Sequence, residues 1–319
     1  MRERTVKTII LLIAITIAAG LVFIGFKFGA FDFIDFCCAN GAGTVEEKLP
    51  LVPKMPVKGQ LSVYFIDVGQ GDAALLVSPS GRTMLIDSGE SIYANRVERF
   101  LNELGVSHID LLIGTHSHSD HIGSMPRIIG DLGVGRYITS AVDVRSEFTA
   151  AVETALEAKT VSIEKVRSGE IIEWDEDCKI TVLSPVLGCE YSTADANDGC
   201  LILRVEFDET AFIFTGDATV HAEQLSMFHN EMEIFKANVL KIAHHGSTTS
   251  SSLGFIETVD ADIAVISVGA ANPYGHPDFD ILNRLSAAGC SIARTDERGT
   301  IAAFSDGSTV SLEFQKPER

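Results

Sequence analysis

Short apolar runs separated by turn residues dominate the chain from residue 61 onward. The runs at 61–68, 73–79 and 82–89 have the length and composition of β-strands, and the turn residues between them are typical of a meandering sheet. Residues 93–105 have a different spacing, in which apolar side chains recur on one helical face until Gly105. The pattern therefore predicts a sheet that starts as a meander and is followed by a helix.

The rest of the chain mixes the two kinds of pattern. We expect strands at 109–116, 136–140, 160–166, 178–185, 200–207, 210–217, 261–269, 290–296, 299–305 and 308–314, and a strand with a loop at 238–247. We expect helices at 121–133, 146–158, 218–230, 252–259 and 279–289. The economical architecture for this mixture is an α+β fold of two packed sheets with helices outside.

The N-terminal residues form a separate segment. Residues 8–26 are 19 uncharged residues, which as a helix would rise roughly 28 Å, about one hydrocarbon core. Small-residue cleavage sites lie more than ten residues past the apolar end, so an uncleaved anchor is favoured over a signal peptide, and a secreted form is the alternative. The basic residues before the span predict a single-pass protein of the cell membrane, with its N-terminus in the cytoplasm and its large domain outside.

The amino-acid composition indicates where the segments of the chain begin and end, and it excludes one class of binding partner. We expect a membrane anchor at 1–30, a linker rich in Gly, Pro, Lys and Glu at 31–59, and a globular domain at 60–319. The net charge is −19 and no cluster of Lys and Arg stands out, so a generic polyanion-binding surface is excluded. The six cysteines include no C-x-x-C pair, which argues against a structural zinc knot and leaves disulfides and free thiols open.

Metal-binding residue types gather at three predicted strand ends. Residues 115–121, THSHSDH, hold three of the nine histidines together with an aspartate. Asp217 follows a second strand, and His244 and His245 follow a third. Imidazole and carboxylate groups are ligands for zinc, manganese or iron. For Asp217 alone a helix N-cap is the strong alternative, but the constellation predicts a metal site.

These motifs resemble a known family. THSHSDH, TGD and HHGS, with IDVGQGDA and LIDSG upstream, are similar to the metallo-β-lactamase superfamily. Longer blocks between residues 61 and 304 resemble more closely the soluble hydrolase domain of the DNA-uptake competence protein ComEC and its stand-alone relatives. The resemblance implies an αββα sandwich with the site at one edge, two divalent ions, and a hydrolase that uses a metal-bound hydroxide.

The resemblance also assigns ligands. It implies that one ion is held by His116 and His118, and that Asp217 bridges it to the second. The ligands implied for the second ion are Asp120, His121 and His245. Asp87 matches an acid that orients a ligand histidine in the family.

Three residues are candidates for catalysis or substrate contact. Asp120 belongs to the ligand motif itself. His244 is a candidate substrate or proton-transfer group, because adjacent residues rarely bind one ion and His245 is the preferred ligand. His276 would line the substrate side, and an ordinary loop histidine is the alternative.

One departure concerns the first ion. Many superfamily members place a further ligand histidine before the bridging aspartate, but residues 122–216 contain no histidine. By resemblance the substitute would be Asp198, with Asn197 behind it. The extra oxygen favours manganese without excluding zinc, so the cofactor is expected to be two ions of zinc or manganese. The alternative is that Asp198 is an ordinary turn residue in ANDG.

Two ions suit phosphodiester cleavage, so a membrane-tethered phosphodiesterase or nuclease is the leading interpretation. Its substrate would be a phosphodiester, possibly DNA, although the acidic composition favours a small or localised one over long duplexes. The alternatives are hydrolysis of a cell-surface phosphocholine or teichoic-type ester, a lactam or a thioester, and a non-catalytic metal-binding sensor. No protein partner can be inferred from the sequence.

Overall fold

The computed structural model of the protein describes residues 50–317. The predicted anchor and the predicted linker as far as residue 49 lie outside the described residues. Within 50–317, none of the helices has both the length and the apolar character needed to cross a membrane.

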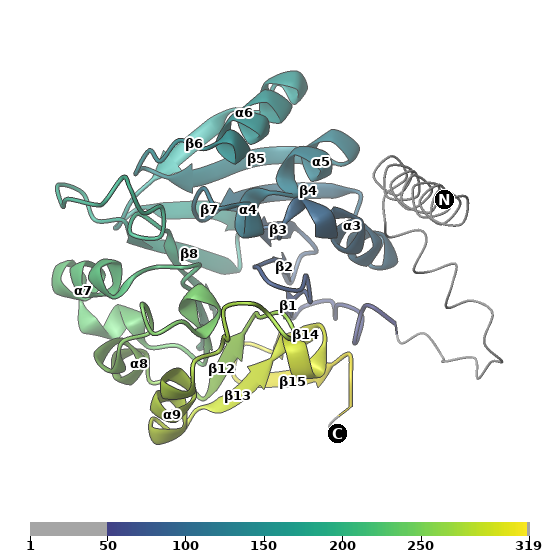
Figure 1. Ribbon diagram of the computed structural model, residues 1–319. Helices are drawn as coiled ribbons and strands as arrows, with labels where there is room; N and C mark the ends of the chain where they lie inside the picture. The colour runs from purple at the N-terminus through teal and green to yellow at the C-terminus, as the bar shows by residue number, and fades with distance from the viewer. Residues whose placement is uncertain (1–49, 318–319) are drawn as a thin grey trace, which may run out of the picture. The chain divides into compact units, whose positions relative to one another are not determined.

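The first of two sheets contains eight strands (Figure 1). Their order is β15-β14-β1-β2-β3-β4-β5-β6. Neighbours from β14 to β3 are antiparallel, which confirms the predicted meander, and neighbours from β3 to β6 are parallel. The strands are β1 (Leu61–Phe65), β2 (Ala74–Val77), β3 (Thr83–Ile86), β4 (His108–Gly114), β5 (Gly133–Ser140), β6 (Ile163–Val166), β14 (Ile301–Ser305) and β15 (Val310–Phe314).

The second sheet contains seven strands in the order β13-β12-β11-β10-β9-β8-β7. Its strands from β10 to β13 are parallel and those from β7 to β10 are antiparallel. The strands are β7 (Ile171–Asp175), β8 (Cys178–Ser184), β9 (Ile202–Phe207), β10 (Thr210–Phe214), β11 (Val239–Lys241), β12 (Ile263–Ile266) and β13 (Ser291–Arg294). The apolar pattern did not predict β7, a short edge strand that carries acidic side chains at two of its five positions.

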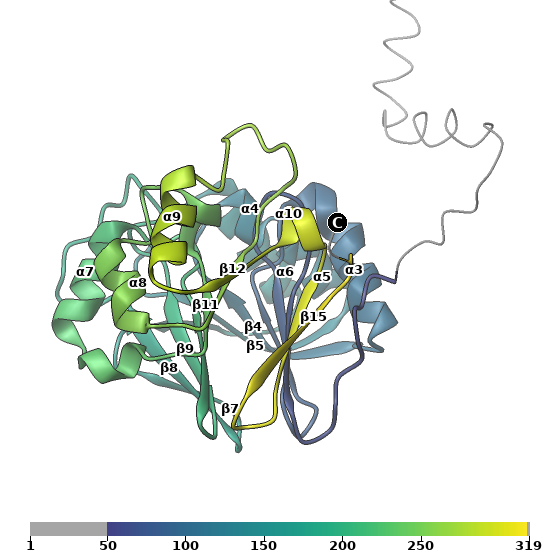
Figure 2. The same ribbon diagram turned by 90° about the horizontal axis from the view of Figure 1, so that it is seen from below.

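Helices cover the outer face of each sheet (Figure 2). The first sheet is covered by α3 (Ala94–Glu103), α5 (Met125–Asp131) and α6 (Glu147–Lys159). The second is covered by α7 (Val220–His229), α8 (Leu253–Val259) and α9 (Phe279–Ala287). Two short helices, α4 (Ser119–Ile122) and α10 (Thr295–Arg298), lie in loops. The single helix expected at 121–133 is divided into α4 and α5 because Pro126 fits only the first turn of a helix.

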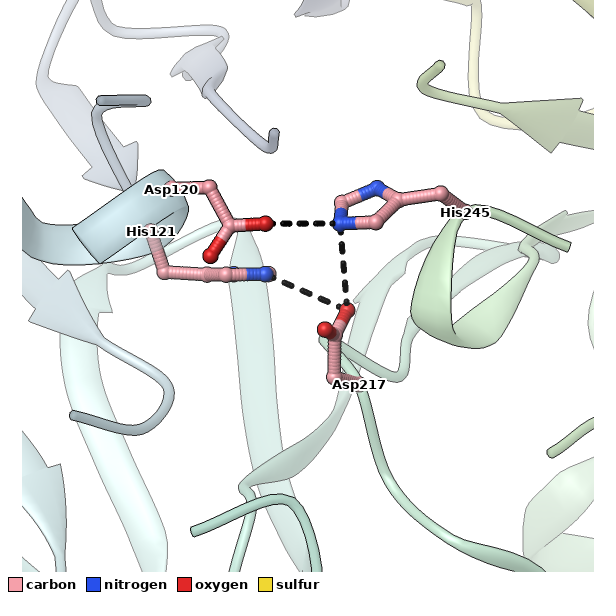
Figure 3. A group of neighbouring side chains, drawn as sticks. All are labelled: Asp120, His121, Asp217 and His245. Atoms are coloured by element: carbon pink, nitrogen blue, oxygen red, sulfur yellow. Dashed lines mark hydrogen bonds and ion pairs between the residues drawn. The ribbon is translucent and has the colours of Figure 1, made fainter. Parts of the chain in front are cut away.

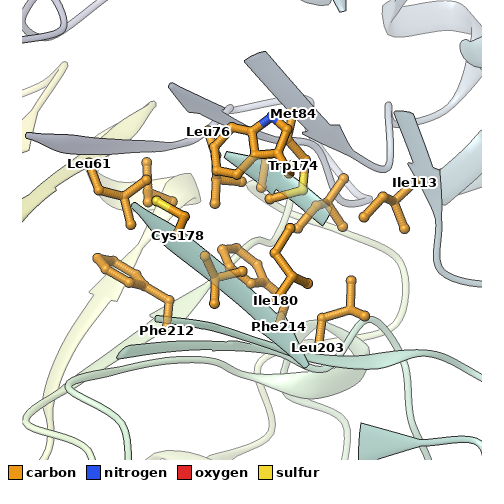
Figure 4. Close-up of a cluster of buried hydrophobic side chains, with 14 of the residues drawn as sticks. Leu61, Leu76, Met84, Ile113, Trp174, Cys178, Ile180, Leu203, Phe212 and Phe214 are labelled. Atoms are coloured by element: carbon orange, nitrogen blue, oxygen red, sulfur yellow. The ribbon is translucent and has the colours of Figure 1, made fainter. Parts of the chain in front are cut away.

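Apolar side chains form three buried layers that follow this order. The layer between the sheets includes Phe65, Met84, Ile180 and Phe212, and Figure 4 shows it enclosed by strands on both sides. The other two layers lie between each sheet and its helices. Each large side chain buried in this way contributes about 1.5–3 kcal/mol. The expected αββα sandwich is therefore confirmed for the described residues.

Candidate metal centre

Parallel pairing brings the polar motifs to one edge of the sandwich. β3 is parallel to β4, and β10 is parallel to β11, so the loops that follow the strands of each pair leave from the same edge of their sheet. Asp87 follows β3 and the residues of THSHSDH follow β4. Asp217 follows β10, and His244 and His245 follow β11.

Four of these residues form a buried cluster that we name the inner group: Asp120, His121, Asp217 and His245. Their side chains point toward one another from both sheets (Figure 3). His121 Nε2 lies 3.2 Å from Asp217 Oδ1, and His245 Nε2 lies 3.2 Å from Asp120 Oδ2 and 3.7 Å from Asp217 Oδ1. One nitrogen or oxygen from each residue therefore faces a common point.

A second cluster, the outer group, consists of His116, His118 and Asp217. His116 Nε2 lies 3.1 Å from His118 Nδ1 and 3.9 Å from Asp217 Oδ2. Asp217 thus directs one carboxylate oxygen to each group. The structure places every residue that the resemblance assigned as a ligand in one of the two groups, with the exception of Asp198.

The carboxylate of Asp87 orients the inner histidine. Asp87 Oδ2 accepts from His121 Nδ1 at 2.7 Å, and its two oxygens also accept from the amide and the hydroxyl of Thr115. This leaves His121 Nε2 free to face Asp217. The second nitrogen of His245 is held in the same way, because Nδ1 lies 2.9 Å from the carbonyl oxygen of Ser267. Partners of this kind fix the ring orientation of ligand histidines.

Asp198, which was expected beside His116 and His118, belongs to neither group among the described residues. Its Oδ1 atom accepts from Thr219 Oγ1 and lies 2.8 Å from His221 Nδ1, while its Oδ2 atom accepts from the Ser192 amide. Burial raises the pKa of Asp198, but these hydrogen bonds outweigh it and the pKa is below its usual value. One oxygen is occupied at the start of α7 and the other by the loop at Ser192, so Asp198 acts as a local anchor. Asn197 is buried beside it in sequence, with its Oδ1 atom unpartnered.

Two charged residues behind the inner group were missed by the sequence analysis. Asp72 and Lys241 are both buried and form an ion pair. Asp72 Oδ1 also lies 3.4 Å from His245 Nδ1, and Lys241 Nζ lies 3.5 Å from the Gly216 carbonyl oxygen. Both residues stand inside the motifs IDVGQGDA and LKIAHHGS, where a lysine in an otherwise apolar strand was the available signal.

Cys200 was also missed as a residue of the site. Its sulfur accepts from the Asp217 amide at 3.3 Å and lies 3.6 Å from His116 Nδ1. Gly216 has a φ of +47°, and a Cβ atom there would lie 2.6 Å from this sulfur, so the close approach requires glycine. Cys178, Cys189, Cys200 and Cys290 are the cysteines of residues 50–317, and all are free thiols.

The buried carboxylates of the inner group need positive charge nearby to balance them. Burial alone would raise the pKa of Asp217, but the neighbouring imidazoles of His121 and His245 hold it well below its usual value. Conversely, burial lowers the pKa of His245, and the carboxylates of Asp217, Asp120 and Asp72 overcome this and raise it to about 10. Without a metal ion, protonated histidines therefore balance the buried carboxylates.

The donor atoms fit divalent ions. His121 Nε2 and Asp217 Oδ1 are buried and lie 3.2 Å apart as an ion pair, but neither atom forms a hydrogen bond among the described residues, and buried polar atoms are rarely left so. An ion in the inner group would satisfy both atoms and would replace the protons on the histidines of that group. Two imidazoles with one or two carboxylates form a suitable ligand set for a transition-metal dication.

A cavity of about 540 Å³ opens above both groups. It is lined by ligands of each group, including His118, Asp120 and His245, and by His244 and His276. The His244 and His276 rings lie 6.0 Å apart. Burial lowers the pKa values of both histidines, which favours the neutral imidazole. The two histidines expected on the substrate side therefore face the same space as the inner and outer groups.

Comparison with known proteins agrees with this geometry. Residues 66–269 match the metallo-beta-lactamase superfamily. ComE operon protein 3 of Bacillus subtilis is 32% identical over 282 residues, which cover 83% of this chain and 35% of that protein. Competence protein ComA of Neisseria gonorrhoeae is 30% identical over 261 residues, which cover 82% of this chain and 34% of ComA. The chain thus spans about a third of the length of these relatives.

The fold also matches solved structures. Igni18, a metallo hydrolase from Ignicoccus hospitalis, superposes with a TM-score of 0.52 at 16% identity, covering 76% of this chain and 98% of that one. At this identity the likeness concerns the fold alone. The family match covers most of the chain, and the inner and outer groups lie within it. The chain therefore belongs to the metallo-β-lactamase superfamily, and its relatives include ComE operon protein 3 and competence protein ComA.

Proposed function

We propose that this protein is a membrane-tethered phosphodiesterase or nuclease whose hydrolase domain lies outside the cell. The observation that carries the proposal is the sharing of Asp217, which directs Oδ1 to the inner group and Oδ2 to the outer group. Two positions joined by one carboxylate suit a reaction in which charge develops on two oxygens at once, as in phosphodiester cleavage.

Ions held by the two groups would activate water and neutralise charge on a phosphoryl group. The chain's own residues provide the geometry around them. Asp217 sets the spacing of the two positions, and Asp87 and Ser267 hold the inner histidines in place. His244 is placed to exchange a proton with a substrate, because its Nδ1 atom is held 2.9 Å from Thr249 Oγ1 and its Nε2 atom lies 3.8 Å from Asp217.

For the ions, we propose zinc or manganese. Each group combines imidazole nitrogens with carboxylate oxygens and includes no thiolate. This mixed set suits both metals, and the second carboxylate of the inner group shifts its preference toward manganese. DNA is a candidate substrate because the sequence motifs resemble those of the DNA-uptake competence protein ComEC.

The membrane tether rests on residues 8–26 and on the basic residues before them. We expect cell fractionation to leave the intact protein in the membrane, and added protease to digest the domain from outside. A soluble mature form that begins near residue 40 would contradict the tether.

The activity is tested by supplying the full chain with manganese or zinc and three substrates: bis-p-nitrophenyl phosphate, single-stranded DNA and nitrocefin. Cleavage of the first two, and not of nitrocefin, is expected. Turnover of nitrocefin alone would replace the phosphodiesterase by a lactam hydrolase. Stoichiometric metal binding without turnover of any ester would favour the sensor interpretation.

A further inference from the structure

The metal-centre cavity has an aromatic rim. Tyr274 and His276 both line the cavity, and their rings are stacked with centroids 5.9 Å apart and planes 15° apart. His276 is next to His244 in space, and the His244 ring lies 6.2 Å from that of the inner ligand His245. A row of rings therefore leads outward from the inner group and ends at Tyr274.

Tyr274 is unusually exposed for an aromatic side chain that lines a cavity. Its relative exposure is 68%. The ring lies nearly parallel to that of His276 but is offset from it, and most of its surface remains accessible. Aromatic rings of this size normally bury most of their surface, and an exposed one at a rigid rim is available to a ligand.

The rim is held in place by Asn272. The Asn272 Oδ1 atom accepts from the amides of Tyr274 and His276 at 3.1 and 3.0 Å. The Asn272 Nδ2 atom donates to the carbonyls of Gly269 and His276 at 3.0 and 2.6 Å. The loop between β12 and α9, which projects from the sandwich in Figure 2, is thus braced from within. A loop whose backbone is held in this way loses little conformational entropy when a planar group stacks on the ring that it carries.

Outside the two candidate metal positions, the cavity has few positively charged side chains that could bind phosphate groups. Arg145 is the one Lys or Arg among the described residues that line it, and ion pairs with Asp143 and Glu153 already engage its guanidinium. With a net charge of −19 on the chain, contacts along a phosphate backbone are weak. Stacking on a neutral ring does not depend on charge, and every nucleobase has a face that can stack.

We propose that Tyr274, backed by His276, is the platform on which an unpaired nucleobase of the substrate stacks while its phosphodiester lies over the metal centre. This assignment rests on the proposed phosphodiesterase function and narrows the substrate class to nucleotide phosphodiesters with an unstacked base. A base within a duplex has both faces covered by its neighbours, so single strands and short nucleotides are the substrates that fit.

The test compares two esters with the same leaving group: the p-nitrophenyl ester of thymidine 5′-monophosphate and methyl p-nitrophenyl phosphate. The measured quantity is the ratio of their kcat/KM values in the full chain supplied with manganese. We expect Tyr274→Ala to lower this ratio about tenfold, because base stacking has that order of effect. Tyr274→Phe keeps the ring and should keep the ratio. The matched control is Phe228→Ala, which removes an aromatic side chain that is 83% exposed on α7 and does not line the cavity.

A ratio that Tyr274→Ala leaves unchanged, or that Tyr274→Phe lowers as much, would overturn the platform. If the wild-type chain hydrolyses neither ester, the phosphodiesterase proposal fails. The stacking role of Tyr274 is then tested by measuring the binding of oligonucleotides. Fluorescence anisotropy would then compare labelled oligothymidylate with an abasic oligomer of equal length. Tighter binding of oligothymidylate that is lost in Tyr274→Ala supports the platform, and equal binding of the two oligomers overturns it.

Discussion

The inner and outer groups share Asp217 but differ in how firmly their other members are held. In the inner group, Asp87 and the Ser267 carbonyl fix the two histidines, and Asp120 adds a second carboxylate. In the outer group, His118 is partly exposed, and among the described residues its Nε2 atom has no hydrogen-bond partner. Preorganised ligands bind an ion more tightly, so we expect the inner position to fill first.

We expect the largest effect when the residue that both groups share is removed. Asp217→Ala should abolish binding of both ions and lower kcat/KM by about a thousandfold or more, since each ion contributes several kcal/mol to such reactions. Metal content by mass spectrometry and hydrolysis of bis-p-nitrophenyl phosphate are the two measurements. Asp198→Ala is the matched control, because Asp198 is also a buried carboxylate beside a histidine but belongs to neither group. Full metal content in Asp217→Ala would show that the groups are misassigned.

A second prediction concerns the ion pair behind the inner group. Asp72→Asn leaves Lys241 buried without its carboxylate partner, which should lower the free energy of unfolding by about 3–5 kcal/mol. Affinity for the inner ion should fall by about 10–100-fold, because His245 loses a neighbour that helps to orient it. The double variant Asp72→Asn with Lys241→Met should be more stable than the single variant in denaturant unfolding. A single variant as stable as the wild type would show that the pair is not needed.

A third prediction concerns Asp198, which lies outside both groups and should affect stability without affecting metal binding. Asp198→Ala removes the partners of the Ser192 amide, Thr219 and His221, and should lower the free energy of unfolding by about 1–2 kcal/mol. Metal stoichiometry should stay at the wild-type value. Selective loss of one ion in this variant would restore Asp198 to the outer group and would overturn its placement as an anchor.

The last prediction is a pH dependence and concerns Glu223, whose carboxylate accepts from the amides of Ser251 and Ser252 in the loop that follows His245. Burial raises the pKa of Glu223 from 4.5 to about 7, against these hydrogen bonds. The folded chain therefore holds a proton that the unfolded chain has lost between about pH 4.5 and 7, so stability falls as the pH rises through this window. The contribution is at most about 1.4 kcal/mol per pH unit.

This effect is measured as a difference between two proteins. Glu223→Gln cannot ionise, so its free energy of unfolding should depend less steeply on pH than that of the wild type between pH 5 and 7. Both proteins are studied without metal, and the histidines of the site then titrate equally in each. Parallel curves would mean that the buried carboxylate keeps its ordinary pKa.

The sequence predicted the sandwich and most of the site because both depend on local patterns. The strand runs are short and apolar, and the ligands follow strand ends that parallel pairing brings to one edge. The pair of Asp72 and Lys241 could not be predicted, since it joins residues far apart in the chain. Asp198 was misplaced because its partners Thr219 and His221 reach it only once α7 packs beside its loop. The strand β7 was missed because packing against β8 outweighs its acidic composition.

The most direct test of the central claim is a calorimetric titration of the metal-free full chain with manganese and with zinc. We expect two ions per chain, with the inner one bound at least about tenfold more tightly. His118→Ala should lose the weaker ion and keep the tighter one, whereas His245→Ala should lose the tighter one. One ion per chain, or the same loss in both variants, would contradict two unequal positions joined by Asp217.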